Sequence, residues 1–305
     1  MAPKAPVKII LGTHTVGDKT ANPGIVHWDE PKDVQALLDT FYGRGYRYID
    51  TASNYPNSEE RLGQAGAASR FTIVTKVRDG IPGSHQPAKL EASIKQSLED
   101  LKTSTVDTMM LHVPDRETPF EDIAKAMNEA YQKGQFKHFG LSNYPAAEVQ
   151  KFLDICEEKG YVKPSVFEGH YNAIYRSGEK ELFPLLRKHN ISFYGYSPAA
   201  GGLFSGKAGT STTSKRWDSD ASITDILAAA EKHGISGHAA ALRWTAFHSI
   251  LDGSYGDGII FTASNLDQLN KTLDAIDAGP LPADLADAFS VLSANTEGHS
   301  LPYHL

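Results

Sequence analysis

The chain has 305 residues, of which 40% are apolar and 22% charged, and its formal net charge is -7. This composition is that of an ordinary globular protein, and the excess of acid argues against nucleic acid or an anionic membrane as the main partner. The single cysteine, Cys156, excludes an intrachain disulfide, and no apolar run reaches the roughly 20 residues that a membrane-spanning helix needs.

The N-terminus carries a short apolar run but no signal-peptide pattern, so we expect a cytoplasmic protein. From there, eight short apolar segments along the chain are predicted to be strands. In chain order they are residues 7–12, 46–50, 71–76, 106–112, 136–142, 165–171, 191–197 and 258–264. Each is nearly continuous in apolar character, which is typical of parallel strands that helices cover.

Helices are predicted between these strands. The segment 31–45 begins with Pro31 and stops near Gly43 and Gly45, the usual asymmetry of helix ends. Within 177–190, Pro184 indicates either a kink or a position in the first turn of a helix. Further helices are predicted at 87–101, 119–134 and 145–160.

The regular alternation of strands and helices predicts a single (β/α)8 TIM barrel that spans residues 1–305. A doubly wound sheet is the alternative, but no G-x-G-x-x-G motif follows the first strand. Two long loops, 13–30 and 197–221, and a C-terminal tail, 293–305, interrupt the rhythm. Both loops follow strands, so we expect them at the C-terminal face, where such barrels carry their active sites.

Four ionisable residues lie at or just past the ends of successive strands. Asp50, Lys76 and His112 end the second, third and fourth strands, and Tyr55 follows Asp50 by five positions. Each alone fits a structural role, but neighbouring strands converge at one rim and would bring all four together. Asp50 would keep Lys76 charged, and the ammonium would lower the pKa of Tyr55. The set therefore predicts proton donation from Tyr55 to a carbonyl group as hydride arrives, with His112 hydrogen-bonded to the oxygen.

The segments around these residues resemble those of the aldo-keto reductases. The matching pieces are YIDTASNYPNSEERLG (48–63), Thr75-Lys76, LHVPD (111–115), FGLSNY (139–144) and FYGYSPAAGGLFSGK (193–207). Two longer pieces, LFPLLRKHNISFYGYSPAAGGLFSGK and GDGIIFTASNLDQL, are most similar to the branch that reduces aflatoxin aldehyde and succinic semialdehyde. The resemblance covers nearly the whole chain.

The resemblance implies reduction of an aldehyde or ketone with NADPH bound in extended form. It implies a catalytic tetrad of Asp50, Tyr55, Lys76 and His112, with Tyr55 as general acid. Segments 197–207 and 263–272 would hold the pyrophosphate and the adenosine 2′-phosphate. The cofactor-binding residues that it implies are Ser142, Asn143, Glu168, Tyr196, Ser197, Pro198, Gly201, Gly202, Leu203, Lys207, Ser264, Asn265 and Gln268.

The sequence departs from the family pattern at four places. Glu168 stands where a glutamine usually binds the carboxamide, and Lys271-Thr272 replaces the usual pair near the adenine. The segment 207–222 is short and lacks an arginine tied to carboxylate substrates, which argues against succinic semialdehyde. The tail EGHSLPYHL also differs.

The mouth of the site is expected to be lined by His27, Trp28 and Trp217 together with Tyr55 and His112. Such a mouth favours an aromatic or secondary-metabolite-like carbonyl substrate.

Two other functions use the same barrel: an NADPH-sensing binding module, and a recruited non-redox acid–base enzyme such as a cyclase or dehydratase. Consumption of the cofactor separates the reductase from the non-redox enzyme. The histidines show no metal-ligand spacing, so no metal site is predicted. Relatives occur as monomers and as homodimers, and both states stay open here.

Overall fold

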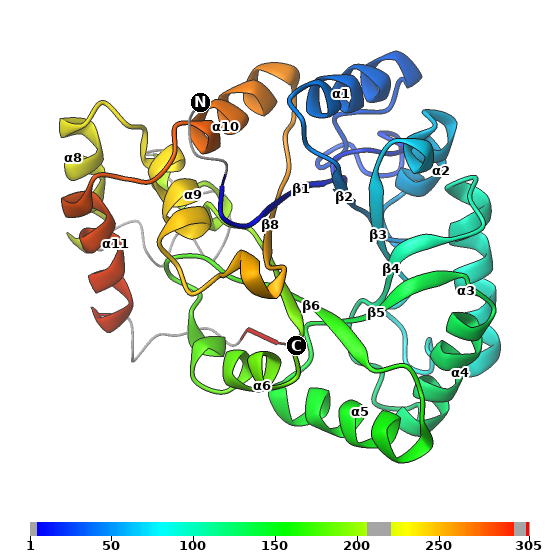
Figure 1. Cartoon of the computed structure of the whole chain (residues 1–305). Coiled ribbons are helices and arrows are strands. Elements are labelled where there is room, and N and C mark those ends of the chain that lie inside the picture. Colours follow the sequence, from blue (N-terminus) through cyan, green and yellow to red (C-terminus); the bar gives the residue numbers. More distant parts are fainter. Residues whose placement is uncertain (1–4, 206–220, 296–302, 305) are drawn as a thin grey trace.

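In the computed structural model, which describes residues 5–205, 221–295 and 303–304, eight parallel strands close into a barrel (Figure 1). Each strand pairs with the next one in chain order, and the last pairs with the first. The strands are β1 (Lys8–Gly12), β2 (Tyr48–Asp50), β3 (Thr72–Lys76), β4 (Val106–Leu111), β5 (Phe136–Ser142), β6 (Pro164–His170), β7 (Ser192–Tyr196) and β8 (Gly258–Phe261). The predicted (β/α)8 barrel is confirmed.

Helices surround the ring of strands (Figure 1). They are α1 (Pro31–Gly43), α2 (Ser58–Gln64), α3 (Pro87–Asp100), α4 (Phe120–Gln132), α5 (Ala146–Lys159), α6 (Leu182–Lys188), α8 (Ala221–Lys232), α9 (Gly237–Phe247), α10 (Leu266–Asp277) and α11 (Ala283–Asn295). Short 3-10 turns are η1 (Ala67–Ser69), η2 (Ser177–Glu179), η3 (Ala200–Ser205) and η4 (Gly253–Tyr255). No described helix combines the length and the apolar composition that crossing a membrane requires.

The predicted elements agree with the observed ones to within a few residues, with one exception. The helix expected over 177–190 is split into η2 and α6. Pro184 lies in the first turn of α6. Because proline has no backbone N–H to bond to the carbonyl oxygen of residue 180, it disfavours a continuous helix through this point.

Apolar side chains fill the inside of the barrel. Ile10, Val74, Met110, Val166 and Ile260 form one cluster there, and a much larger cluster packs between the strands and the helices. The barrel is therefore a packed core and not a pore, and a site has to lie at one of its ends.

The strand registers bring the candidate residues to one end. Asp50 is the last residue of β2 and pairs with Val74, two positions before Lys76. On the other side of the barrel Ser142 pairs with Glu168. These positions all lie at the carboxyl ends of their strands, so their side chains share one rim.

Candidate active site

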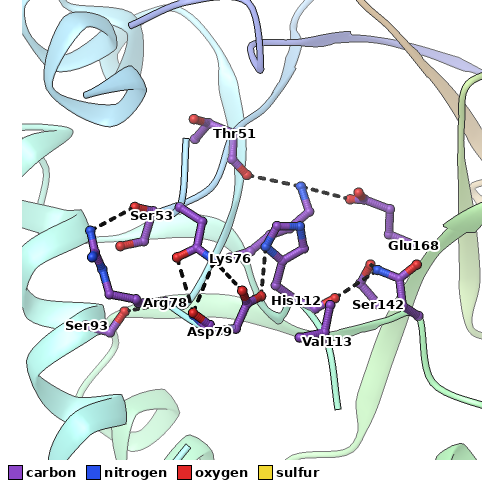
Figure 2. A network of polar contacts seen from close by, with 12 residues as sticks. Thr51, Ser53, Lys76, Arg78, Asp79, Ser93, His112, Val113, Ser142 and Glu168 are labelled. Atoms are coloured by element: carbon purple, nitrogen blue, oxygen red, sulfur yellow. Dashed lines mark hydrogen bonds and ion pairs between the residues drawn. The ribbon is translucent and has the colours of Figure 1, made fainter. Parts of the chain in front are cut away.

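Lys76, the last residue of β3, is fully buried and lies between two carboxyl groups. Its Nζ is 2.5 Å from Oδ2 of Asp50, 3.2 Å from Oε2 of Glu168 and 3.1 Å from the carbonyl oxygen of Thr51. Figure 2 shows the ammonium between Thr51 and Glu168. Burial opposes the charged form, but the charges of Asp50 and Glu168 raise the pKa of Lys76 above its ordinary value. The predicted pairing of Lys76 with Asp50 is confirmed.

Glu168 is buried beside the lysine that it faces. Burial raises the pKa of its carboxyl well above the ordinary value, and the charge of Asp50 raises it further, against the opposing effect of Lys76. A protonated carboxyl can donate one hydrogen bond as well as accept, as a glutamine amide can. In its protonated form, Glu168 can therefore still act as a donor at this position.

Tyr55 lies in the loop between β2 and α2, above Lys76. The Lys76 Nζ is 5.6 Å from the centre of the Tyr55 ring, and the rings of His112 and His14 lie 5.9 and 4.7 Å from it. Burial raises the pKa of the Tyr55 phenol and outweighs the lowering by Lys76. The expectation of a lowered pKa is therefore wrong, because the sequence shows the charged neighbour but not how deeply the hydroxyl is enclosed.

His112 directly follows β4 and faces an acidic residue that the sequence reasoning missed. Its Nδ1 lies 2.9 Å from Oδ2 of Asp79, in the loop after β3 (Figure 2). The four predicted residues Asp50, Tyr55, Lys76 and His112 are thus brought together at one rim.

Asn143 connects the ends of three strands. Its backbone has a φ of 64°, a left-handed conformation that asparagine tolerates better than most residues. Its amide nitrogen donates to the carbonyl oxygen of His112 and to Oγ of Ser142, both at 3.0 Å. Its side-chain oxygen accepts from the hydroxyl of Tyr196 at 2.9 Å. The ring of Tyr196 in turn stacks on His170 at 5.0 Å.

A cavity of about 990 Å³ connects this cluster with a distant pair of residues. It begins at Asp50, Tyr55 and His112 and ends at Asn265 and Gln268, at the start of α10. Asn265 caps this helix by accepting from the backbone N–H of Gln268 at 2.8 Å. One cavity therefore connects the cluster at the carboxyl ends of the strands with the start of α10.

A pair of glycines lines part of the cavity between these two ends. Gly201 and Gly202 have φ values of 61° and 86°, and a Cβ added at either position would meet no atom within 4 Å. Ser236, which also lines the cavity, caps α9 by accepting from the N–H of Ala239 at 3.2 Å. The N-termini of both α9 and α10 thus open onto the cavity, and free N–H groups at helix N-termini favour anions.

Of the other predicted cofactor residues, some lie near this cavity and one lies outside the residues that the structure describes. Ser197 and Pro198 line it, Leu203 is buried behind it, and the N–H of Ser264 donates to the side chain of Gln268 at 2.6 Å. Lys207 lies outside the described residues.

The residues expected at the mouth are only partly brought there. Trp28 is buried, and its Nε1 donates to the carbonyl oxygen of Ala263 at 2.6 Å, so it anchors the first long loop. His27 is exposed, and neither residue is among the described residues that line the cavity. His14, from the same loop, lines it instead. Trp217 lies outside the described residues.

Several residues of the site were missed from the sequence. Ser236 had a readable signal, since a serine before an apolar helical run is a usual N-cap. His14 and Asp79 had none, because their contacts depend on the paths of loops.

Comparisons with known proteins agree with this geometry. The sequence model of the Aldo/keto reductase family matches residues 8–292. An aldo-keto reductase of Pseudocercospora fijiensis is 36% identical over 291 residues, which cover 85% of this chain and 98% of the relative. Human aflatoxin B1 aldehyde reductase member 2 is 32% identical over 320 residues, covering 94% and 87%. Oxidoreductase sirO of Leptosphaeria maculans is 34% identical over 306 residues, covering 93% and 92%.

Proposed function

The chain belongs to the aldo/keto reductase family, whose members are oxidoreductases that act on carbonyl compounds, and we propose that it reduces an aldehyde or ketone to the alcohol with NADPH. The observation that carries this proposal is the buried Lys76, held by Asp50 and Glu168 beneath Tyr55 at one end of an extended cavity. We propose the barrel as a single domain, acting as a monomer or homodimer in the cytoplasm.

The volume of the cavity and the residues along it suit an extended dinucleotide. Asn143 and Glu168 would hold the carboxamide, and Tyr196 would stack against the nicotinamide ring, since all three line the cavity beside the lysine cluster. The N–H groups around Gly201 and Gly202 and at the start of α9 would hold the pyrophosphate. NADPH bound in this way supplies the hydride.

The 2′-phosphate of the adenosine would lie at the start of α10. Asn265 and Gln268 line that end of the cavity, and Lys271 one turn further on is the cation nearest to them on this helix. A helix N-terminus together with a lysine is a suitable anion site. This arrangement supports NADPH over NADH.

The residues of the cluster have different roles at the carbonyl oxygen of the substrate. His112 and Tyr55 hydrogen-bond the oxygen, which gains negative charge when the carbon accepts hydride. Tyr55 then gives up its phenolic proton to form the alcohol. Its raised pKa keeps the phenol protonated until that moment, and an alkoxide is basic enough to take the proton. Lys76, kept charged by Asp50, stabilises the phenolate that remains.

An aromatic or secondary-metabolite-like carbonyl compound is the substrate class that the mouth supports best. The rings of His14, Tyr55 and His112 lie close together there. Flat aromatic compounds stack well against such rings. A human relative carries the name of an aldehyde reductase for aflatoxin B1, which agrees with this class.

The test follows NADPH oxidation by absorbance with nitrobenzaldehyde as substrate. We expect Tyr55→Phe to lower kcat by at least about 100-fold, since positioned acid catalysis contributes a factor of this order. Binding of NADPH, measured by fluorescence, should stay unchanged. Tyr131→Phe, a variant of an exposed tyrosine on α4, is the matched control.

The other outcomes favour other functions. Tight NADPH binding without turnover by the wild type would support a sensing module. Absence of NADPH binding would support a non-redox enzyme on this barrel.

A further inference from the structure

Asp79 in the loop after β3 faces His112 from the side opposite the cavity cluster of Lys76 (Figure 2). Its Oδ2 lies 2.9 Å from Nδ1 of His112, and the two side chains are only 6% and 19% exposed. In the described part of the chain, neither atom forms a hydrogen bond of regular geometry with any group. Their contact at 2.9 Å leaves a proton on Nδ1 as the group that can pair with this carboxylate oxygen.

A second residue fixes Asp79 in place. The side-chain amide of Asn54 donates to Oδ1 of Asp79, and its side-chain oxygen accepts from the backbone N–H of Asp79 at 3.4 Å. Arg78 adds a contact of 3.4 Å to the carbonyl oxygen of Ser53 (Figure 2). The loop that carries Tyr55 and the loop that carries Asp79 are thus joined, and Oδ2 alone is left to face the imidazole.

We infer that Asp79 is a positioning residue, which fixes a proton on Nδ1 of His112 and directs Nε2 to the substrate carbonyl oxygen. The effect on catalysis rests on the proposed reduction, whereas the contact between Asp79 and His112 does not depend on it. A carboxylate that binds one ring nitrogen of a histidine sets the tautomer and the orientation of the ring. Here Asn54 orients the carboxylate in turn.

The protonation pattern decides what His112 can do. With Nδ1–H directed at Asp79, Nε2 of a neutral ring has no proton and can only accept a hydrogen bond. The ring donates to a carbonyl oxygen only when both nitrogens carry protons, and its positive charge then lies beside Asp79. Such a charge-assisted hydrogen bond is about twice as strong as a neutral one. It would strengthen further as negative charge develops on the oxygen.

Kinetics separate this role from a merely structural one. We expect Asp79→Asn to lower kcat by about 10- to 100-fold, the usual effect of losing a carboxylate that orients a histidine. The KM for the aldehyde and the Kd for NADPH should change little, because the hydrogen bond strengthens mainly in the transition state. Arg78→Ala is the matched control, since it loosens the same loop without touching His112. An unchanged kcat in Asp79→Asn, or an equal loss in Arg78→Ala, would overturn the inference.

A spectroscopic readout tests the same inference without turnover. Long-range ¹H–¹⁵N correlation spectra of the wild-type histidine rings, with His112→Gln to assign the signal, report which nitrogen is protonated. We expect a protonated Nδ1 at His112, and a neutral ring protonated only at Nε2 would overturn the inference even if Asp79→Asn fails to fold. A protonated Nδ1 in a protein that turns over no aldehyde would uphold the role of Asp79 and reject the proposed function.

Discussion

At the scale of single residues, the charge balance of the cluster around Lys76 depends on whether Glu168 carries a proton. Two ionised carboxylates and one ammonium would leave an uncompensated negative charge in a buried place, which is costly. Protonation of Glu168 avoids this cost, because Asp50 and Lys76 then form a neutral pair. Tyr55 consequently faces an ammonium and a neutral carboxyl. This charge state favours the phenolate that proton transfer leaves behind.

Glu59 on α2 is another buried carboxyl, and it predicts a pH dependence of stability. It accepts hydrogen bonds from the hydroxyls of Thr75 and Ser97, yet burial raises its pKa from 4.5 to about 7. The folded state thus binds this proton more tightly than the unfolded chain does. Its stabilisation is complete below about pH 4.5 and is lost as the pH rises through 7, by roughly 3 kcal/mol in total.

Urea unfolding at pH 5 and pH 8 measures this effect. Between these pH values the free energy of unfolding of the wild type should fall by roughly 2 to 3 kcal/mol more than that of Glu59→Gln. Glu60→Gln, on the more exposed side of the same helix, should behave as the wild type does. Equal pH dependence in wild type and Glu59→Gln would contradict the raised pKa.

Residues at strand ends were predictable, whereas residues in loops were not. Asp50 and Lys76 follow from the order of the strands, because each ends a strand and neighbouring strands share a rim. Asp79 and His14 lie in loops without any periodic pattern, and only the folded path brings them to His112 and Tyr55. Burial of a titratable group is equally invisible in sequence, which is why the pKa of Tyr55 moves against expectation.

At the scale of elements, strands and helices were predicted because their apolar patterns are long and regular. The exception is the segment 177–190, where one proline divides a helical pattern into η2 and α6. The helix α9 as a whole was not predicted, although Ser236 is its N-cap. For α10, the sequence did point to the helix start. Asn265, expected to contact the 2′-phosphate, is the N-cap of this helix in the structure.

Two charged side chains near the start of α10 should influence the preference of the enzyme for NADPH over NADH. Lys271 and Asp267 line the cavity and form an exposed ion pair at 2.7 Å. A 2′-phosphate would attract the lysine and repel the aspartate. We expect Lys271→Met to lower kcat/KM for NADPH about tenfold, or ~1.4 kcal/mol, with little change for NADH. Asp267→Asn should shift the preference in the opposite direction.

Steady-state kinetics with both cofactors check this prediction. Lys232→Met, at the end of α8 and in a charged, exposed setting, is the control for loss of a surface charge. If Lys271→Met reduced the values for NADPH and NADH equally, the lysine would not contact the 2′-phosphate.

At the scale of the whole molecule, the cavity is built from distant parts of the chain. Its walls come from the loop after β1, from the ends of β2, β6 and β7, and from the N-termini of α9 and α10. The barrel closure that brings β8 beside β1 also brings α10 to the rim that carries Asp50. The fold class was predictable from the alternation of elements, but the continuity of this cavity was not, because it depends on closure.

A ligand that bridges so many elements should stabilise the whole barrel. If NADPH binds along the cavity, a concentration of 100 times its Kd raises the free energy of unfolding by about 2.7 kcal/mol. For a domain of this size the melting temperature should rise by roughly 5 °C. NADH at the same concentration should raise it less, because it lacks the phosphate that the start of α10 would hold. The measurement is a thermal melt followed by circular dichroism. An equal rise with both cofactors would place the adenosine end away from α10, and no rise with either would contradict cofactor binding along this cavity.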